Sequence, residues 1–303
     1  MTLHQLFRVQ FLALAFTILP QNAVAQDVIL GVLEEHKGHY VREPNYRTVR
    51  AVFQKTGAGW HAFRSDCGES SCLKTSTSEY PAKVKWRIAF NGKQIGHLTS
   101  RTPKDFAWYA SVGEQEIVSS EPIPSVGVRS PEFGGFTDET VYRPLIATSR
   151  DYFKDPDDWK PFSAPAKLAT GLKAAFREKF PKLCRLTGPN ADELKPFPYQ
   201  NTDVKIKKSY KSRANWSVAR LHLEAVDCTD DEGSFLIDDP WFMVDPKGSI
   251  TYLDSGIWLV DAGDYDNDGK SELVFSIDRE NRGGYELFFN DFEKRVTFEF
   301  SYH

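Results

Sequence analysis

Alternation of apolar and polar residues runs through most of this 303-residue chain, and this two-residue period is the feature that most constrains its fold. Between Val84 and Phe90 the alternation gives a predicted strand with one apolar face and one basic face. Asn91-Gly92 follows, and this dipeptide is typical of a two-residue hairpin turn. Residues 241–253 predict a second hairpin, and residues 296–302 alternate in the same way. The pattern predicts an all-β fold.

One segment has a helical period instead. Between Ser163 and Pro181 the apolar residues form a single helical stripe, which consists of Leu168, Leu172, Ala175, Phe176 and Phe180. Ser163 is the predicted N-cap of this helix, and Pro181 ends it. We expect residues 26–303 to form one β-rich domain, with a domain boundary or a helical insertion near residues 151–200.

Short predicted strands, frequent glycine turns and an aromatic content of 14% favour either a β-propeller or a β-sandwich. A propeller is typically built from repeats of about 40–50 residues. Apolar patterns recur loosely around several tryptophans, but no motif repeats cleanly. The periodicity by itself therefore leaves both architectures open.

Residues 1–25 resemble a secretory signal peptide. Arg8 gives a positive start, residues 11–19 form a short apolar core that Pro20 ends, and Ala23-Val24-Ala25 is a typical cleavage site. Nine apolar residues are too few to span a membrane, which takes roughly 20. We expect export to the periplasm or the extracellular space, with a mature chain that begins at Gln26.

Export determines how the four cysteines are interpreted, because disulfides persist in oxidising compartments. Cys67 and Cys72 lie in one short loop, so we predict a Cys67–Cys72 disulfide and a second disulfide between Cys184 and Cys228. The alternative is a zinc site with four cysteine ligands. Such a site usually has paired Cys-x-x-Cys spacing, which this sequence lacks.

The charge balance argues against one large class of partner. The chain has 38 Lys and Arg against 42 Asp and Glu, a formal net charge of −4, which does not suit binding of nucleic acid through bulk positive charge. No apolar run after residue 25 is long enough to span a membrane. The Gly-x-Ser-x-Gly, His-Glu-x-x-His and phosphate-loop motifs are absent, so we identify no catalytic residue.

The segment that indicates chemistry is an acidic loop at residues 264–272. Three aspartates alternate along it, Gly269 permits a sharp bend, and the predicted metal ligands are Asp264, Asp266, Asp268, the carbonyl of Lys270, and Glu272. Hard oxygen ligands in this number suit Ca²⁺, whereas Mg²⁺ demands stricter geometry. An EF-hand would need a glutamate at the twelfth position, which is Phe275 here.

Strand-like residues flank this loop, and residues 258–277 as a whole resemble the calcium loops of FG-GAP and VCBS-type repeats. Those Asp-x-Asp-x-Asp-Gly-x-x-Asp loops occur in integrin α-chain propellers and in exported bacterial proteins. The resemblance implies a β-propeller-like fold and a bound Ca²⁺. Glu272 stands where the family usually has aspartate, and the motif occurs once in this chain.

Two further polar groups have less specific interpretations. His36 and His39 stand three residues apart and could bind a transition metal, but we interpret residues 34–39 as an exposed polar turn. Acidic residues at 228–233 and 238–239 could supply the paired carboxylates of a glycosidase, although nothing in the sequence fixes their separation.

The sequence therefore favours an exported, calcium-binding, β-rich binding or structural protein without catalytic activity. Its partner would be an unidentified ligand outside the cell or in the cell envelope, either protein or carbohydrate, and not nucleic acid. The alternative is a secreted, carbohydrate-active hydrolase in which the calcium loop braces the scaffold.

Overall fold

The computed structural model describes most of the chain after the predicted signal peptide. The described residues are 27–36, 46–57, 59–68, 70–126, 129–130, 141–142, 144–150, 154–187, 193–227, 239–279 and 281–301. The predicted signal peptide (residues 1–25), His39 and Cys228 lie outside these ranges.

The N-terminal part of the chain is a closed barrel of six antiparallel strands. In their order around the barrel these are β1 (Val28–His36), β9 (Leu145–Thr148), β4 (Lys83–Phe90), β5 (Lys93–Arg101), β6 (Glu114–Ile117) and β2 (Tyr46–Thr56). Pairing between β1 and β2 closes the ring. The shorter elements around it are β3 (Gly59–Ala62), α1 (Ser70–Ser76), the 3₁₀ turns η1 (Thr77–Glu79) and η2 (Tyr109–Ser111), and the pair β7 (Arg129–Ser130) and β8 (Val141–Tyr142).

Trp86 fills the interior of the barrel. Its indole Nε1 donates to Ser100 Oγ at 2.6 Å, and that hydroxyl donates to Gln115. Gly31 on β1 faces the ring, because a Cβ atom at this position would lie 3.0 Å from Trp86 Cη2. The predicted hairpin of β4 and β5 is confirmed, and both Asn91 (φ 49°) and Gly92 (φ 67°) have the positive φ that its tight turn requires.

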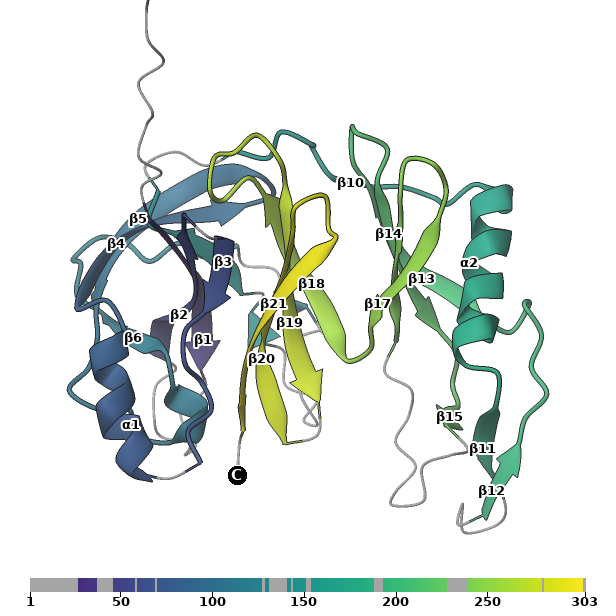
Figure 1. Cartoon of the computed structure of the whole chain (residues 1–303), viewed down its shortest axis with the longest axis horizontal. Helices are drawn as coiled ribbons and strands as arrows, with labels where there is room; N and C mark the ends of the chain where they lie inside the picture. The colour runs from purple at the N-terminus through teal and green to yellow at the C-terminus, as the bar shows by residue number, and fades with distance from the viewer. Residues whose placement is uncertain are drawn as a thin grey trace, which may run out of the picture.

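The middle of the chain forms a second sheet, here called the middle sheet, with the order β10 (Lys160–Pro161), β13 (Lys205–Lys211), β14 (Ser217–His222), β16 (Trp241–Val244) and β17 (Ile250–Asp254). Helix α2 (Ala166–Lys179) packs against one face of it through Leu172 and Phe176. The predicted helix is confirmed, but its N-cap is Pro165 and not Ser163. A small three-stranded sheet follows α2 in the chain and lies below the middle sheet in the view of Figure 1. Its order is β12 (Glu193–Pro196), β11 (Leu183–Thr187) and β15 (Val226–Asp227).

The last four strands form an antiparallel meander, here called the C-terminal sheet: β18 (Ile257–Gly263), β19 (Glu272–Arg279), β20 (Arg282–Phe289) and β21 (Lys294–Ser301). One face shares a core with the barrel, through residues such as Val274, Leu287 and Phe298. The opposite face packs on the middle sheet, where Phe275 meets Trp241. Figure 1 shows the resulting order of layers: barrel, C-terminal sheet, middle sheet and α2.

The all-β prediction is confirmed, but the prediction of a β-propeller is wrong. Strands that are far apart in sequence, such as β1 and β9, pair to close a barrel instead of forming separate blades. Local alternation predicts each hairpin but does not say which hairpins become neighbours, and this is why the architecture was missed. The sandwich alternative describes only the face-to-face packing of the C-terminal sheet on the middle sheet.

Gly284 is required where β20 meets β21. A Cβ atom here would lie 2.0 Å from the carbonyl oxygen of Phe298, which no rotation of a side chain can relieve. We therefore expect Gly284→Ala to lower the free energy of unfolding by more than about 2 kcal/mol in denaturant titration. The control is Gly57→Ala, where a Cβ atom meets nothing within 4 Å. Equal stability of the two variants would contradict the pairing of these strands.

Candidate metal centre

The acidic loop lies between two paired strands, as the sequence predicts. β18 and β19 are antiparallel with Gly263 opposite Glu272, and residues 264–271 connect them. Asp264 also forms an isolated bridge with Lys154, whose carbonyl accepts the Asp264 N–H at 2.9 Å. The loop is therefore a strand–loop–strand unit that a neighbouring segment holds in place.

Three of the predicted ligands converge. Carboxylate oxygens of Asp264, Asp266 and Asp268 lie within 4.8 Å of one another. Asp264 and Asp266 are buried, with 3% and 5% of their surface exposed, whereas Asp268 is exposed. An ion at this point would therefore have protein on one side and solvent access through Asp268 on the other.

Backbone hydrogen bonds fix the loop in this shape. Asp264 accepts the N–H groups of Asp268 and Gly269, each at 2.9 Å, and Asp266 accepts the Asp268 N–H at 3.1 Å. Asn267 and Gly269 have φ values of 61° and 90°, which asparagine and glycine tolerate better than other residues. The sequence thus supplies the residues that a tight turn around the carboxylates requires.

The other two predicted ligands are placed differently. Glu272 is 2% exposed and accepts the Tyr265 N–H at 2.8 Å, but it is not part of the group of oxygens that lie within 4.8 Å of one another. The side chain of Lys270 pairs with Asp291, and the backbone N–H of Lys270 donates to the Asp268 carboxylate at 2.9 Å. The role of the Lys270 carbonyl as a ligand stays a prediction.

Residues outside the loop hold it against the barrel. Lys55, on β2, pairs with the carboxylate of Asp266, and Arg150 donates to the Asp266 carbonyl. Ser271 donates to Asp155 at 2.6 Å. These contacts place the loop at the junction between the barrel and the C-terminal sheet, and the sequence did not indicate that Lys55 or Arg150 would reach it.

Burial and mutual repulsion make this cluster electrostatically unfavourable. Burial, and then the negative charge of Asp266, raise the pKa of Glu272 well above its ordinary value, and burial also raises the pKa of Asp264. Lys55 supplies one positive charge to a group of four carboxyls. A divalent cation would compensate most of the remaining charge, and all-oxygen donors of this kind are the ligands that Ca²⁺ prefers. The residues present therefore fit the predicted metal.

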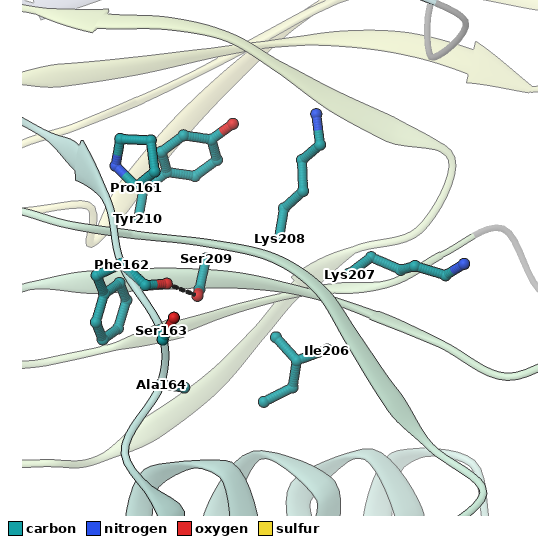
Figure 2. A pocket seen from close by; sticks show the side chains of 9 residues that line it. All are labelled: Pro161, Phe162, Ser163, Ala164, Ile206, Lys207, Lys208, Ser209 and Tyr210. Atoms are coloured by element: carbon teal, nitrogen blue, oxygen red, sulfur yellow. Dashed lines mark hydrogen bonds between the residues drawn. The ribbon is translucent and has the colours of Figure 1, made fainter.

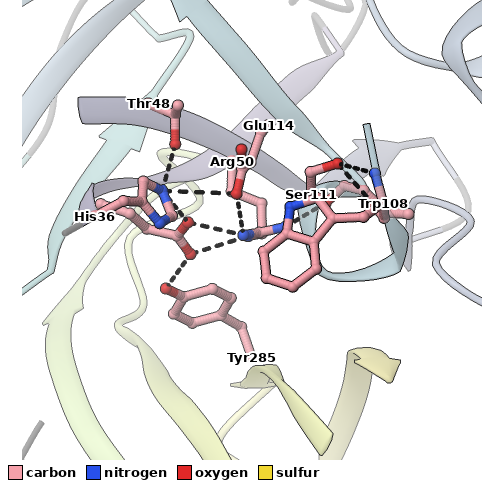
Figure 3. Close-up of polar contacts among 9 residues, drawn as sticks. His36, Thr48, Arg50, Trp108, Ser111, Glu114 and Tyr285 are labelled. Atoms are coloured by element: carbon pink, nitrogen blue, oxygen red, sulfur yellow. Dashed lines mark hydrogen bonds and ion pairs between the residues drawn. The ribbon is translucent and has the colours of Figure 1, made fainter. Parts of the chain in front are cut away.

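A second cluster lies on β1, β2 and β6 (Figure 3). Ligand atoms of Glu34, His36 and Glu114 also lie within 4.8 Å of one another, but Arg50 stands between the carboxylates. Arg50 Nε donates to Glu34 at 2.9 Å, and another guanidinium nitrogen donates to Glu114 at 2.8 Å. A guanidinium already occupies the position that a metal would take, so this is an ion-pair network, here called the Arg50 network.

The interpretation of Glu34 and His36 as part of an exposed turn is wrong. Both residues end strand β1, and their side chains are only 12% and 23% exposed. The sequence did carry a signal for the network, because Arg50 interrupts an otherwise apolar run from Val49 to Phe53. A lone arginine in a buried strand requires acidic partners.

The predicted Cys67–Cys72 disulfide is present, with the two Cα atoms 5.3 Å apart. The four-cysteine zinc site is thereby excluded, because these two sulfurs are bonded to each other. Cys184 is also disulfide-bonded, and its predicted partner, Cys228, lies outside the described residues.

The acidic residues considered for glycosidase chemistry do not form a carboxylate pair within the described part of the chain. Residues 228–233 and 238 lie outside it, and Asp239 pairs with Arg220 at 3.0 Å and with His222 at 2.5 Å. An open groove of about 460 Å³ lies between β13 and the segment that leads into α2. Figure 2 shows Lys207 and Lys208 beside this groove, and no carboxylate or histidine lines it.

No family model, curated protein or solved structure matches this chain. Among the described residues, no helix has the length and apolar character needed to cross a membrane.

Arg50 should be the most sensitive charged residue of the barrel. Its side chain is 3% exposed, so Arg50→Met would leave Glu34 and Glu114 buried without their cation. We expect a loss of about 3–5 kcal/mol in the free energy of unfolding, measured by denaturant titration at neutral pH. Lys160→Met removes an exposed pair with Asp158 and should change stability by less than about 0.5 kcal/mol. A small effect of Arg50→Met would argue against the network.

Proposed function

We propose that this protein is an exported, calcium-stabilised, β-rich binding or structural protein, in which a Ca²⁺ ion held by the loop at 264–272 secures the C-terminal sheet to the barrel. One observation carries the proposal. The oxygens of Asp264, Asp266 and Asp268 converge at the point where Lys55 of the barrel meets the loop of the C-terminal sheet.

The position of the loop supports a stabilising role for the ion. An unfolded chain cannot bring these carboxylates together, so an ion that binds only the folded state stabilises it by mass action. The Asp264 N–H also donates to the carbonyl of Lys154, so an ion that fixes the shape of the loop would also stabilise its contact with this neighbouring segment.

Export is part of the same proposal. The Cys67–Cys72 disulfide suits an oxidising compartment, and calcium-binding modules outside the cell function with weak affinity because calcium is abundant there. The partner would be an extracellular or cell-envelope protein or carbohydrate. Catalysis is not included in the proposal. A glycosidase needs two carboxyl groups beside a cleft, and the groove beside β13 has no carboxylate in its lining.

Calcium should raise the thermal stability of the full mature chain. When free calcium is a hundredfold above its dissociation constant, the gain in the free energy of unfolding should be about 2.7 kcal/mol. Calorimetry with calcium, with magnesium and with chelator measures it, and magnesium should restore less stability than calcium. Asp268→Ala should remove most of the response.

The matched control is Asp245→Ala, which alters an acidic turn whose carboxylate accepts the N–H groups of Lys247 and Ser249. This variant should keep the full calcium response. Identical melting of the wild type with calcium and with chelator would rule out a stabilising ion.

Lys55 should compete with calcium for the loop. Its ammonium group pairs with the Asp266 carboxylate, so an incoming ion must displace or share this contact. Lys55→Met should therefore raise calcium affinity, by about tenfold or 1.4 kcal/mol, and lower the stability of the calcium-free protein. Isothermal titration with calcium measures the affinity. Lys93→Met, at an exposed position on β5, is the control and should bind calcium as the wild type does.

A further inference from the structure

The Arg50 network lies outside the barrel interior, beneath the C-terminal sheet. Residues directly opposite each other on paired strands share a face, and Arg50 is opposite both Val32 and Glu114. The neighbouring Gln115 points the other way, toward Ser100 and Trp86 inside the barrel. From β20, Tyr285 Oη donates to Glu34 at 2.6 Å. The network is thus part of the seam between two layers.

Among the residues that the structure describes, the network lacks one positive charge. Arg50 provides a single cation, and both Glu34 and Glu114 pair with it. The Tyr285 hydroxyl also donates to Glu34, and Arg50 also donates to the Val112 carbonyl. Both of these groups are neutral. With a neutral His36 and both glutamates ionised, the described residues of this seam would hold one uncompensated negative charge, which is costly at such burial. Burial already raises the pKa of Glu114, which is the effect expected of such a charge.

His36 is placed to supply that charge. Its Nε2 lies 2.8 Å from Thr48 Oγ1, 3.3 Å from Glu34 Oε2 and 3.6 Å from Glu114 Oε1. A nitrogen that faces three oxygens is best satisfied when it carries a hydrogen. Because two of these oxygens belong to carboxylates, their negative charge favours the cationic ring. Tyr46 stacks on the imidazole with ring centroids 4.8 Å apart, and an aromatic face also favours a cation.

The other charged groups near His36 have partners of their own. Glu35 pairs with Arg47 on the opposite face of the strands, and Glu116 pairs with Arg101 at an exposed position. In the described part of the chain, the titratable groups that face the imidazole are therefore Glu34 from β1, Glu114 from β6, Arg50 and Tyr46 from β2, and Tyr285 from β20.

We propose that the Arg50 network is a proton-binding site, in which His36 holds one proton between Glu34 and Glu114 and loss of that proton loosens the seam between the barrel and the C-terminal sheet. The exchange is simple, because the imidazolium gives one ring proton to solvent and becomes neutral. The inference rests on this cluster alone and does not depend on calcium.

The direction of the pH dependence follows from the shift at His36. Burial disfavours its charged form, but the hydrogen bond and charge of Glu34 and the charge of Glu114 outweigh burial, so the pKa of His36 lies above 6.5. A raised pKa means that the folded state binds the proton more tightly than the unfolded state does. The stabilisation is complete below pH 6.5 and is lost as the pH rises through the pKa of folded His36.

Two measurements on the full mature chain test the proposal. In an NMR titration, the His36 ring signal, assigned by its absence in His36→Gln, should titrate above pH 6.5. In denaturant unfolding between pH 5.5 and 9, the wild-type folding constant should fall by up to tenfold per pH unit above 6.5, until the pKa of folded His36 is passed. Hydrogen-exchange protection of β20 amides should fall over the same range.

Matched variants separate the proton from mere packing. His36→Gln should flatten the pH profile. Glu114→Gln should narrow the pH range over which stability is lost, because Glu34 still faces the imidazole. It should do so without a loss of stability at pH 9, because it removes the excess charge. His97→Gln is the control, since His97 is 58% exposed and pairs with Glu121 at the surface. It should keep the wild-type profile.

The outcomes that overturn the proposal are equally direct. A His36 signal that titrates at or below pH 6.5 would show that the seam holds no extra proton. A His36→Gln variant with the wild-type pH profile would do the same. If His36→Gln fails to fold, the His36 signal of the wild type can be assigned through the sequential backbone connectivity of β1. The wild-type titration then decides alone.

Discussion

The burial of Arg50 between two glutamates is the interaction on which the junction of the layers depends. β2 presents its outer face to the C-terminal sheet, and a charged residue on that face is tolerated only where acidic partners meet it. Glu34 and Glu114 come from the strands on either side of β2, so barrel closure itself assembles the partners. The cation then stacks on Phe300 of β21, 4.4 Å from the ring centroid. Formation of the barrel and attachment of the sheet are therefore coupled.

The same strand reaches a second acidic cluster at its other end. Lys55 lies on the same face of β2 and pairs with Asp266 in the loop between β18 and β19. The apolar core of the seam lies between these two clusters, with Leu30 and Phe53 from the barrel and Val274 and Leu287 from the sheet. Apolar residues make up the buried core of the interface between the barrel and the C-terminal sheet, and the two charged clusters lie at its ends. In our proposals one end responds to calcium and the other to protons.

Local features of the fold were predictable from the sequence, and non-local ones were not. Asn91-Gly92 indicates its hairpin because the turn and its strands are adjacent in the chain, and the stripe through Leu172 and Phe176 indicates α2 for the same reason. Barrel closure depends on β1 reaching both β2 and β9, which no local pattern reports. The acidic loop showed the same division: its three aspartates were identified from spacing, whereas Lys55, more than 200 residues away, was not.

The position of the C-terminal sheet in the middle of the layers has a consequence for how the chain folds. Residues 257–301 complete the core that faces the barrel and also the core that faces the middle sheet, although they are synthesised after both. Neither earlier part can bury the apolar face that meets this segment until the segment arrives. These contacts have long sequence separation, so folding should be slow. Until residues 257–301 join them, the barrel and the middle sheet each expose the apolar face that this segment later covers, and exposed apolar strands favour aggregation.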